Sequence, residues 1–280
     1  MGVVAWVDAL AAGVLGLLVG SFLNVVIYRL PKMLERQWAA ECADLAGKEP
    51  ATAEPFNLLV PRSRCGQCGH AIRWYENIPV LSYAFLRGKC SACGTRISIR
   101  YPLVELFTGA LFAFCGWRWG LTWTALAWCG FAAAIVALAF IDWDTTLLPD
   151  DITLPLLWAG LIAAVLGWSG VALPTALWGA VAGYLSLWSI YWAFRLLTGK
   201  EGMGFGDFKL FAALGAWFGV TALIPIILMS SVIGAVVGIA MKFSSGLREG
   251  GYVPFGPFLA AAGLTAMLFG PESILRVVGL

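Results

Sequence analysis

Acidic residues are scarce in this apolar sequence, and several of them stand at the edges of long apolar segments. Asp142 and Asp144 follow the apolar segment 121–141, and Asp207 opens the segment 207–219. Ionisable groups at membrane depth are energetically costly, so such carboxylates are candidates for function. Two carboxylates that meet can share one proton. The ionised acid can then take a proton from water while the protonated acid polarises a peptide carbonyl, which is hydrolysis without a covalent intermediate.

The same acids could instead form an ion or proton pathway, and composition and spacing alone do not separate the two. Asp150 and Asp151 follow Pro149, and we expect them to cap the next helix. A plain helix end explains Asp207 less well, because glycines occupy the alternate positions 202, 204 and 206 before it. These glycines permit the close approach of another helix or of an extended peptide.

The polar part of the chain contains two C-x-x-C pairs, which are Cys65 with Cys68 and Cys90 with Cys93. Two such pairs at this spacing are typical of one tetrahedral zinc ion, and four thiolates leave no open position, so we expect a structural metal. We expect Gly66 and Gly69 to ease the tight turns. Two disulfides or a redox pair are the alternatives, and a reducing cytoplasm disfavours structural disulfides. His70 could compete as a ligand, although a surface position is the simpler expectation.

The composition indicates a membrane protein. Of 280 residues, 60% are hydrophobic and only 12% are charged, and the mean hydropathy is +0.84. A soluble chain carries about twice that charge. With about 20 apolar residues per membrane crossing, we predict an all-α polytopic protein with eight spans, or seven if the short sixth segment does not cross. The expected segments are 3–28, 101–117, 121–141, 152–168, 174–196, 207–219, 221–241 and 254–270.

The distribution of basic residues predicts the topology. Eleven of the 18 Lys and Arg residues lie between positions 29 and 100. With eight spans and this stretch inside, the loops at 142–151, 197–206 and 242–253 also face the cytoplasm, and 16 of the 18 basic residues become cytoplasmic. The N-terminus is then outside, and Asp142 and Asp207 lie on the same, cytoplasmic, side. The first segment lacks a basic start, so we expect a retained helix rather than a signal peptide.

The domain organisation that follows has three parts. Residues 1–28 form the first transmembrane helix, residues 29–100 a small basic zinc-knuckle domain in the cytoplasm, and residues 101–280 the transmembrane catalytic core. No internal repeat is apparent in the sequence.

Seven motifs in sequence order resemble those of the bacterial type IV prepilin peptidases, which are also N-methyltransferases. They lie at 21–31, 62–68, 77–79, 86–90, 101–105, 142–151 and 204–207, and the similarity covers nearly the whole chain. The resemblance implies two catalytic aspartates, one in D-x-x-x-x-x-[IL]-P-[DN] and one in G-x-G-D. Counting back from Pro149 selects Asp142 rather than Asp144, and the second is Asp207. We expect Gly204, Gly206, Lys209 and Pro149 to support the loops or the substrate around them.

The resemblance also implies the reaction and its partners. The substrates would be type IV prepilins and type II secretion pseudopilins in the bacterial inner membrane, cut after a Gly and before an apolar residue, usually Phe. The new N-terminus would be methylated from S-adenosylmethionine; no nucleic-acid partner is expected. We attribute docking of the basic leader to the acids at 142–151. A peptidase without methyltransferase activity, or a zinc-regulated proton-coupled transporter, are the alternatives.

The residues that would bind S-adenosylmethionine cannot be named from the sequence. The glycine-rich stretch 201–206 superficially resembles the loop of soluble methyltransferases, but that loop requires a preceding strand and a βαβ unit, and here it joins two apolar segments. Glu105, just inside the second segment, could contact the cofactor or the substrate amine. It could equally be an ion-pair partner of Arg100 or of another basic residue.

Overall fold

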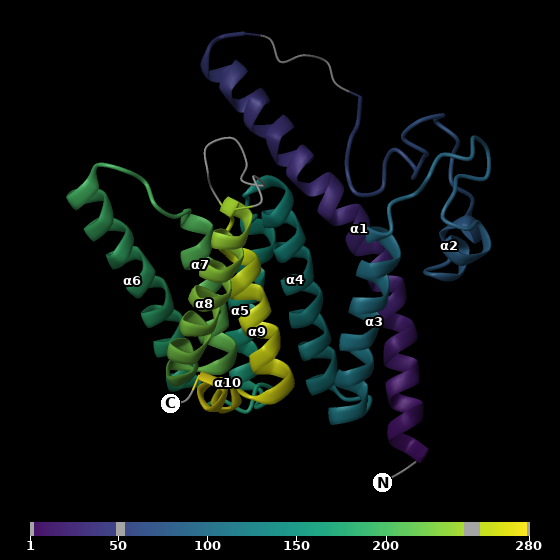
Figure 1. The fold of residues 1–280 in the computed structure, drawn as a ribbon. Helices are drawn as coiled ribbons and strands as arrows, with labels where there is room; N and C mark the ends of the chain where they lie inside the picture. Colours follow the sequence, from purple (N-terminus) through teal and green to yellow (C-terminus); the bar gives the residue numbers. More distant parts are fainter. Residues whose placement is uncertain (1–2, 49–53, 244–252, 279–280) are drawn as a thin grey trace. The chain divides into compact units, whose positions relative to one another are not determined.

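The computed structural model describes residues 3–48, 54–243 and 253–278, and this part of the chain is mostly helical, apart from the largely irregular stretch 54–99. Within it, the only β-structure consists of two isolated bridges. The chain divides into two compact units, Met1–Ala125 and Leu126–Leu280. Figure 1 shows the helices of each unit along the chain. The elements are α1 Val3–Leu45, η1 Trp74–Asn77, α2 Leu81–Phe85, α3 Arg100–Trp119, α4 Trp123–Thr145, α5 Asp150–Val165, α6 Leu173–Thr198, α7 Phe205–Phe218, η2 Val220–Ala222, α8 Leu223–Phe243, α9 Gly256–Phe269 and α10 Pro271–Val278.

In the first unit, α1 and α3 lie side by side because small residues on α1 let the two backbones approach (Figure 1). A Cβ on Gly16 would lie 2.6 Å from Phe112 Cβ, and one on Gly20 would lie 2.7 Å from Glu105 Cα. The structure therefore groups α3 with α1. We had expected α3 to belong with the core at 101–280, because hydropathy alone does not record which apolar helices share a glycine-lined face.

The first helix is longer than the apolar segment that predicted it. We expected a helix over 3–28, and α1 continues to Leu45. The extension is polar and rich in good helix formers, and Gln37 Nε2 donates to Glu41 Oε1 at 2.9 Å, one turn apart. Hydropathy detects the apolar part of a helix only, so it placed the helix end too early.

In the second unit, α7 is the central helix, with α5, α6 and α9 packed against it. The Trp217 Nε1 of α7 donates to the Leu156 carbonyl of α5 at 2.9 Å, and Gly160 leaves room for that indole ring. Gly179 of α6 and Gly215 of α7 meet backbone to backbone, because a Cβ on either would collide with the other's carbonyl. The residues of α7 from Asp207 to Trp217 are nearly all buried.

Three helices of the described residues are long and apolar enough to cross a membrane, namely Val4–Leu45, Trp123–Thr145 and Val220–Phe243. The chain is therefore a membrane protein, while the count of eight spans stays a prediction. The apolar segments expected at 101–270 all coincide with helices to within a few residues. However, α7 and α9 have 14 residues each, about 21 Å at 1.5 Å per residue, which is less than the roughly 30 Å of a bilayer core.

Candidate active site and metal centre

The second unit brings Asp142 and Asp207 to the same end of its helix bundle. Asp142 lies in the last turn of α4 and Asp207 in the first turn of α7. Both are buried, with 4% and 7% of their surfaces exposed. Asp144, two residues after Asp142, is exposed. Burial thus singles out the same two acids that the motif spacing selected; their catalytic role stays a prediction.

One leucine links the surroundings of the two aspartates. Leu148, in the short connection between α4 and α5, packs against Gly206, where a Cβ would lie 2.6 Å from Leu148 Cβ. On its other side Leu148 reaches Gly256, the first residue of α9. A Cβ on Gly256 would in turn lie 2.5 Å from Asp142 Oδ2. A chain of contacts therefore runs from the carboxylate of Asp142 through Gly256 and Leu148 to Gly206, the residue preceding Asp207.

The carboxylate of Asp207 is held in an apolar setting that leaves one oxygen available. Its Oδ1 is buried and has no hydrogen-bond donor within the described residues. A buried carboxylate oxygen without a donor is costly, which is typical of an atom that receives a substrate or a water during function. Behind it, the rings of Tyr191, Phe205 and Phe208 pack with centroids 5.1 to 5.7 Å apart and fix the start of α7 against α6.

The glycines before Asp207 differ in what they accommodate. Gly206 receives Leu148, so its lack of a side chain is used by the protein itself. At Gly204, which precedes α7 as its N-cap, a Cβ would meet only Asp207 Oδ2, at 3.8 Å. This leaves open space beside the carboxylate.

Lys209 forms an ion pair with Asp150 near these acids. Its Nζ lies 2.7 Å from both carboxylate oxygens of Asp150, which joins the start of α7 to the start of α5. The expectation that Asp150 and Asp151 cap this helix is wrong. Pro149 is the N-cap, its carbonyl accepts from the amide of Thr153, and the two acids lie in the first helical turn. Proline can take that position because its extended backbone already directs the carbonyl into the helix.

Three residues of this site were not found from the sequence: Leu148, Gly256 and Tyr191. Leu148 occupies the [IL] position of the D-x-x-x-x-x-[IL]-P-[DN] stretch, but no role was assigned to it, and Tyr191 is an ordinary residue of an apolar segment that carries no signal. For Gly256 a weak signal existed, since a glycine between Phe255 and Pro257 opens the last apolar segment. The loop expected at 242–253 lies almost entirely outside the described residues.

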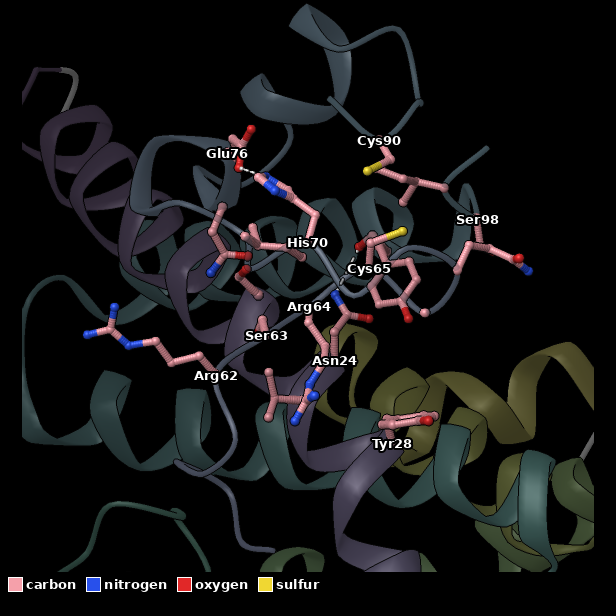
Figure 2. Close-up of a pocket in the computed structure, with 18 of the residues that line it drawn as sticks. Asn24, Tyr28, Arg62, Ser63, Arg64, Cys65, His70, Glu76, Cys90 and Ser98 are labelled. Carbon is pink, nitrogen blue, oxygen red and sulfur yellow. Dashed lines mark hydrogen bonds and ion pairs between the residues drawn. The ribbon is translucent and has the colours of Figure 1, made fainter. Parts of the chain in front are cut away.

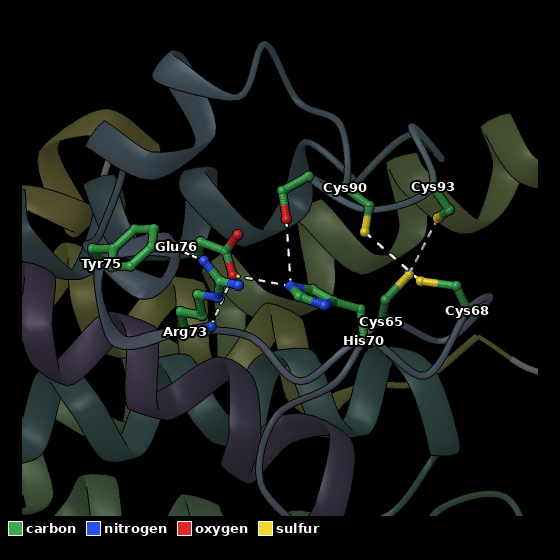
Figure 3. A network of polar contacts seen from close by, with 9 residues as sticks. Cys65, Cys68, His70, Arg73, Tyr75, Glu76, Cys90 and Cys93 are labelled. Atoms are coloured by element: carbon green, nitrogen blue, oxygen red, sulfur yellow. Dashed lines mark hydrogen bonds and ion pairs between the residues drawn. The ribbon is translucent and has the colours of Figure 1, made fainter.

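The first unit brings the four cysteines together. Cys65 Sγ lies 3.8 Å from Cys93 Sγ, Cys68 Sγ lies 4.0 Å from Cys90 Sγ, and all four sulfur atoms are within 4.8 Å of one another (Figure 3). Zinc–sulfur bonds of about 2.3 Å in a tetrahedron place sulfur atoms about 3.8 Å apart, so the cluster fits a zinc ion. All four are free thiols rather than disulfides. The expected closeness of the cysteines is confirmed, and their metal stays a proposal.

The two cysteine turns repeat each other, which the sequence analysis missed. Each is closed by an antiparallel bridge, Arg64 with Ala71 and Lys89 with Arg96. In each, the glycine after the second cysteine donates its amide to the carbonyl of the first cysteine at 3.0 Å and has a φ of +72°. Gly69 and Gly94 therefore supply the left-handed residue. Gly66, which we had expected to help, has no positive φ. The shared pattern is a basic residue followed by C-x-x-C-G, too short to be noticed as a repeat.

Electrostatics within the cluster favours thiolates at some positions. The hydroxyl of Thr95, 3.3 Å from the sulfur, lowers the pKa of the Cys93 thiol to about 6. The backbone amide of Cys68 lowers the pKa of the Cys65 thiol. Metal binding requires thiolates, so these local donors reduce the proton competition that a metal ion meets.

His70 does not join the metal ligands. Its Nε2 lies 3.3 Å from Glu76 Oε2 and 3.4 Å from Ser91 Oγ, so it connects η1 with the second cysteine turn (Figure 3). The hydroxyl of Ser91 and the amide of Arg73 are the main reasons why the pKa of Glu76 falls to about 2. Because the same nitrogen faces both the acid and the serine, this trio cannot act as a Ser–His–acid relay, which uses both ring nitrogens.

Glu105 is buried near the start of α3, with 8% of its surface exposed. Its Oε2 accepts the amide of Val80 at 2.8 Å. The carboxylate thus stabilises a backbone turn, which differs from the ion pair with Arg100 that we considered from the sequence.

Comparison with known proteins gives a consistent family assignment. Residues 14–119 match the bacterial peptidase A24 N-terminal domain, and residues 129–239 match the type IV leader peptidase family. A protein of Pseudomonas putida is 55% identical over 93% of this chain and 90% of its own length, and one of Pseudomonas aeruginosa is 52% identical over 92% and 89%. One of Burkholderia pseudomallei is 50% identical over 95% and 87%.

Each of these relatives bears the name prepilin leader peptidase/N-methyltransferase. No solved structure matches the chain. With about half of all residues identical over nearly the full length of both chains, the resemblance inferred from the seven motifs is confirmed, and the chain belongs to the type IV leader peptidase family.

Proposed function

We propose that this protein removes the leader peptide of type IV prepilins and pseudopilins and then methylates the new N-terminal residue. The observation that carries the peptidase half is the pair of buried carboxylates, Asp142 and Asp207, at one end of an apolar helix bundle. The names of the relatives support both halves. Cleavage follows a Gly and precedes an apolar residue, usually Phe.

The proposed cleavage uses the two acids in complementary protonation states. Like charges in a buried site do not readily ionise together, so the pair holds one proton between its two members. The ionised member takes a proton from water as the water oxygen attacks the peptide carbonyl. The protonated member hydrogen-bonds that carbonyl oxygen and stabilises the developing negative charge. The proton then passes to the leaving amine.

The space at Gly204 gives the scissile segment a route to the acids. A side chain at this position would stand beside the Asp207 carboxylate. A prepilin that is cut directly after a glycine has no side chain on the residue that precedes the scissile bond. We therefore place the scissile glycine against Gly204. We attribute docking of the basic leader to the acids at 142–151, among which Asp144 is exposed and Asp150 is paired with Lys209.

For the metal and the cofactor, the proposal is a structural zinc ion on Cys65, Cys68, Cys90 and Cys93, and S-adenosylmethionine as the methyl donor. The zinc ion would join two turns that otherwise share few contacts. We further propose eight spans with the N-terminus outside, the 29–100 domain in the cytoplasm, and the acids at the cytoplasmic face of the inner membrane.

The test is cleavage and methylation of a purified prepilin, followed by mass spectrometry. Asp142→Asn and Asp207→Asn should each abolish the loss of the leader mass, while both variants still methylate a pilin that has already been cut. Asp144→Asn is the matched comparison, an exposed acid two residues away: it should still remove the leader, at a reduced rate because its charge takes part in docking the leader. Cleavage retained in either of the first two variants would refute the assignment. A wild-type protein that cleaves but adds no methyl mass would leave a peptidase alone.

A further inference from the structure

The first unit contains a large cavity that the peptidase does not use. It has a volume of about 960 Å³ and is lined by α1, the start of α3 and the cysteine-bearing segment between them. Figure 2 shows Asn24 and Tyr28 of α1 together with Arg64 and His70 of the cysteine-bearing segment around it. Sites for cofactors and other small ligands commonly measure 300 to 1,000 Å³, by a rough survey range. A nucleoside with an amino-acid side chain would fit.

A buried carboxylate, Glu105, stands in the wall of this cavity where the apolar helices meet the polar segment. It accepts the amide hydrogen of Val80 and a hydrogen bond from the side chain of Ser21. A carboxylate has about four acceptor positions, so capacity remains for a cationic group in the cavity. A charge this buried is expected to have a partner, and a protonated amine supplies one.

The backbone beside Glu105 is strained. Val80 has a φ of +60°, which is rare for a β-branched residue and costs about 1 to 3 kcal/mol. The hydrogen bond from its amide to Glu105 helps to keep this conformation. Strain of this kind is typical of sites where a side chain must be held in one place.

Other residues that line the cavity suit the rest of such a ligand. The guanidinium of Arg29 is buried and donates to the carbonyls of Asn57 at 2.9 Å and Pro61 at 2.6 Å, which fixes that wall of the cavity to α1. The aromatic residues Tyr28 and Phe56 and the positive charge of Arg64 line the cavity. One face of the Tyr28 ring carries Lys32 and one face of the Phe56 ring carries Arg36. Aromatic faces favour a purine base and an arginine favours a carboxylate.

We propose that this cavity is the methyl-transfer site, where S-adenosylmethionine binds and Glu105 receives the α-amine of the cleaved pilin. The inference rests on the proposed methyltransferase function. Glu105 accepts a proton from the ammonium group, and the amine lone pair then attacks the methyl carbon. The carbon–sulfur bond breaks toward sulfur, which leaves a neutral thioether and an N-methylammonium product. The bound nucleoside supplies the methyl group on a positively charged sulfur.

The first experiment separates this role of Glu105 from a purely structural one. Glu105→Gln keeps an oxygen that can accept the Val80 amide but cannot take a proton. Methylation of a pre-cut pilin should fall about 100-fold, while zinc content, cleavage and the dissociation constant for S-adenosylmethionine stay within about twofold. Unchanged methylation would overturn the role of Glu105. Loss of zinc, cleavage and cofactor binding together would show that the residue only stabilises the fold.

The second experiment tests the location of the cofactor. Ser82 lines the cavity, whereas its neighbour Leu81 does not line it and is exposed. Ser82→Trp should weaken binding of S-adenosylmethionine, measured by calorimetry, by about tenfold or more, and Leu81→Trp should bind as the wild type does. Equal binding by both variants would overturn the location.

Photolabelling of the wild type with methyl-labelled S-adenosylmethionine decides the matter should Ser82→Trp fail to fold. A labelled peptide from residues 21–105 supports the proposal, and one from residues 126–280 overturns it. If the wild type cleaves prepilin but neither binds the cofactor nor methylates, the proposed methyltransferase function itself has failed. If it methylates while the label falls outside 21–105, only the placement in this cavity has failed.

Discussion

Replacing Gly256 with alanine should disable cleavage while leaving the fold intact. The added methyl group would lie 2.5 Å from Asp142 Oδ2 and 3.1 Å from Leu148 Cδ1, whereas ordinary contacts begin at 3.4 Å. The carboxylate oxygen must therefore move by about 0.9 Å. Because it is the end of a rotatable side chain, the move costs little stability, and alanine is favoured over glycine in a helix by about 1 kcal/mol. Misplacing a reacting group by about 1 Å can lower a rate about 100-fold.

The assay for this prediction is the kcat for leader removal from a purified prepilin, with thermal unfolding in the same detergent. We expect kcat to fall about 100-fold, the melting temperature to hold or rise, and methylation of a pre-cut pilin to be unchanged. The matched control is Gly130→Ala. Gly130 lies on the same helix as Asp142, and its new methyl group would meet nothing within 4 Å. A normal kcat in Gly256→Ala would refute the view that the position of Asp142 against α9 sets the reaction geometry.

Three further predictions concern the surroundings of the two sites. Lys209→Met or Asp150→Asn should lower kcat for cleavage about tenfold. Either should change the unfolding free energy by less than about 1 kcal/mol, because the ion pair is partly exposed. The double variant with the two charges exchanged should recover part of the rate, and no recovery would contradict a positioning role for the pair. Cys90→Ser should release zinc, measured by atomic absorption, and loosen residues 54–100 to proteolysis, and unchanged zinc content would remove the metal assignment. In metal-free protein, the rate of alkylation of Cys93 should reach half of its maximum near pH 6, because the thiolate is the reacting form and the pKa of this thiol is lowered to about 6. Thr95→Val removes the hydroxyl that stabilises the thiolate, so this midpoint should move to higher pH. An unchanged midpoint would contradict the role of Thr95.

Local patterns in the sequence were sufficient for the helices and the cysteine cluster. Apolar runs mark α3 to α9 to within a few residues, because a helix in an apolar medium must be apolar along most of its length. Likewise, each C-x-x-C turn is closed by its own backbone, as at Cys65 and Gly69. The spacing of the cysteines therefore carries nearly all the information that positions them.

Contacts between distant segments were not readable in the same way. The approach of Gly256 to Asp142 joins the start of α9 to the end of α4, and no local pattern encodes such a pair. The pairing of Lys209 with Asp150 was missed for a related reason: an acid in the first turn of a helix is already explained by the helix dipole. Composition also could not divide the apolar helices between units, since that depends on which glycine faces meet.

The short length of α7 determines how deep Asp207 lies in the membrane, and this depth bears on the substrate. A helix of about 21 Å is shorter than a bilayer core of about 30 Å, so when α7 spans with its far end at one surface, its first residues lie inside the apolar layer. Asp207 belongs to the first turn of α7 and is 7% exposed. A carboxylate at that depth meets a peptide bond only where a substrate helix begins to emerge from lipid. Under the proposed function, the scissile bond of a membrane-inserted prepilin lies at this level, so a soluble peptide of the same sequence should be a poorer substrate than the precursor.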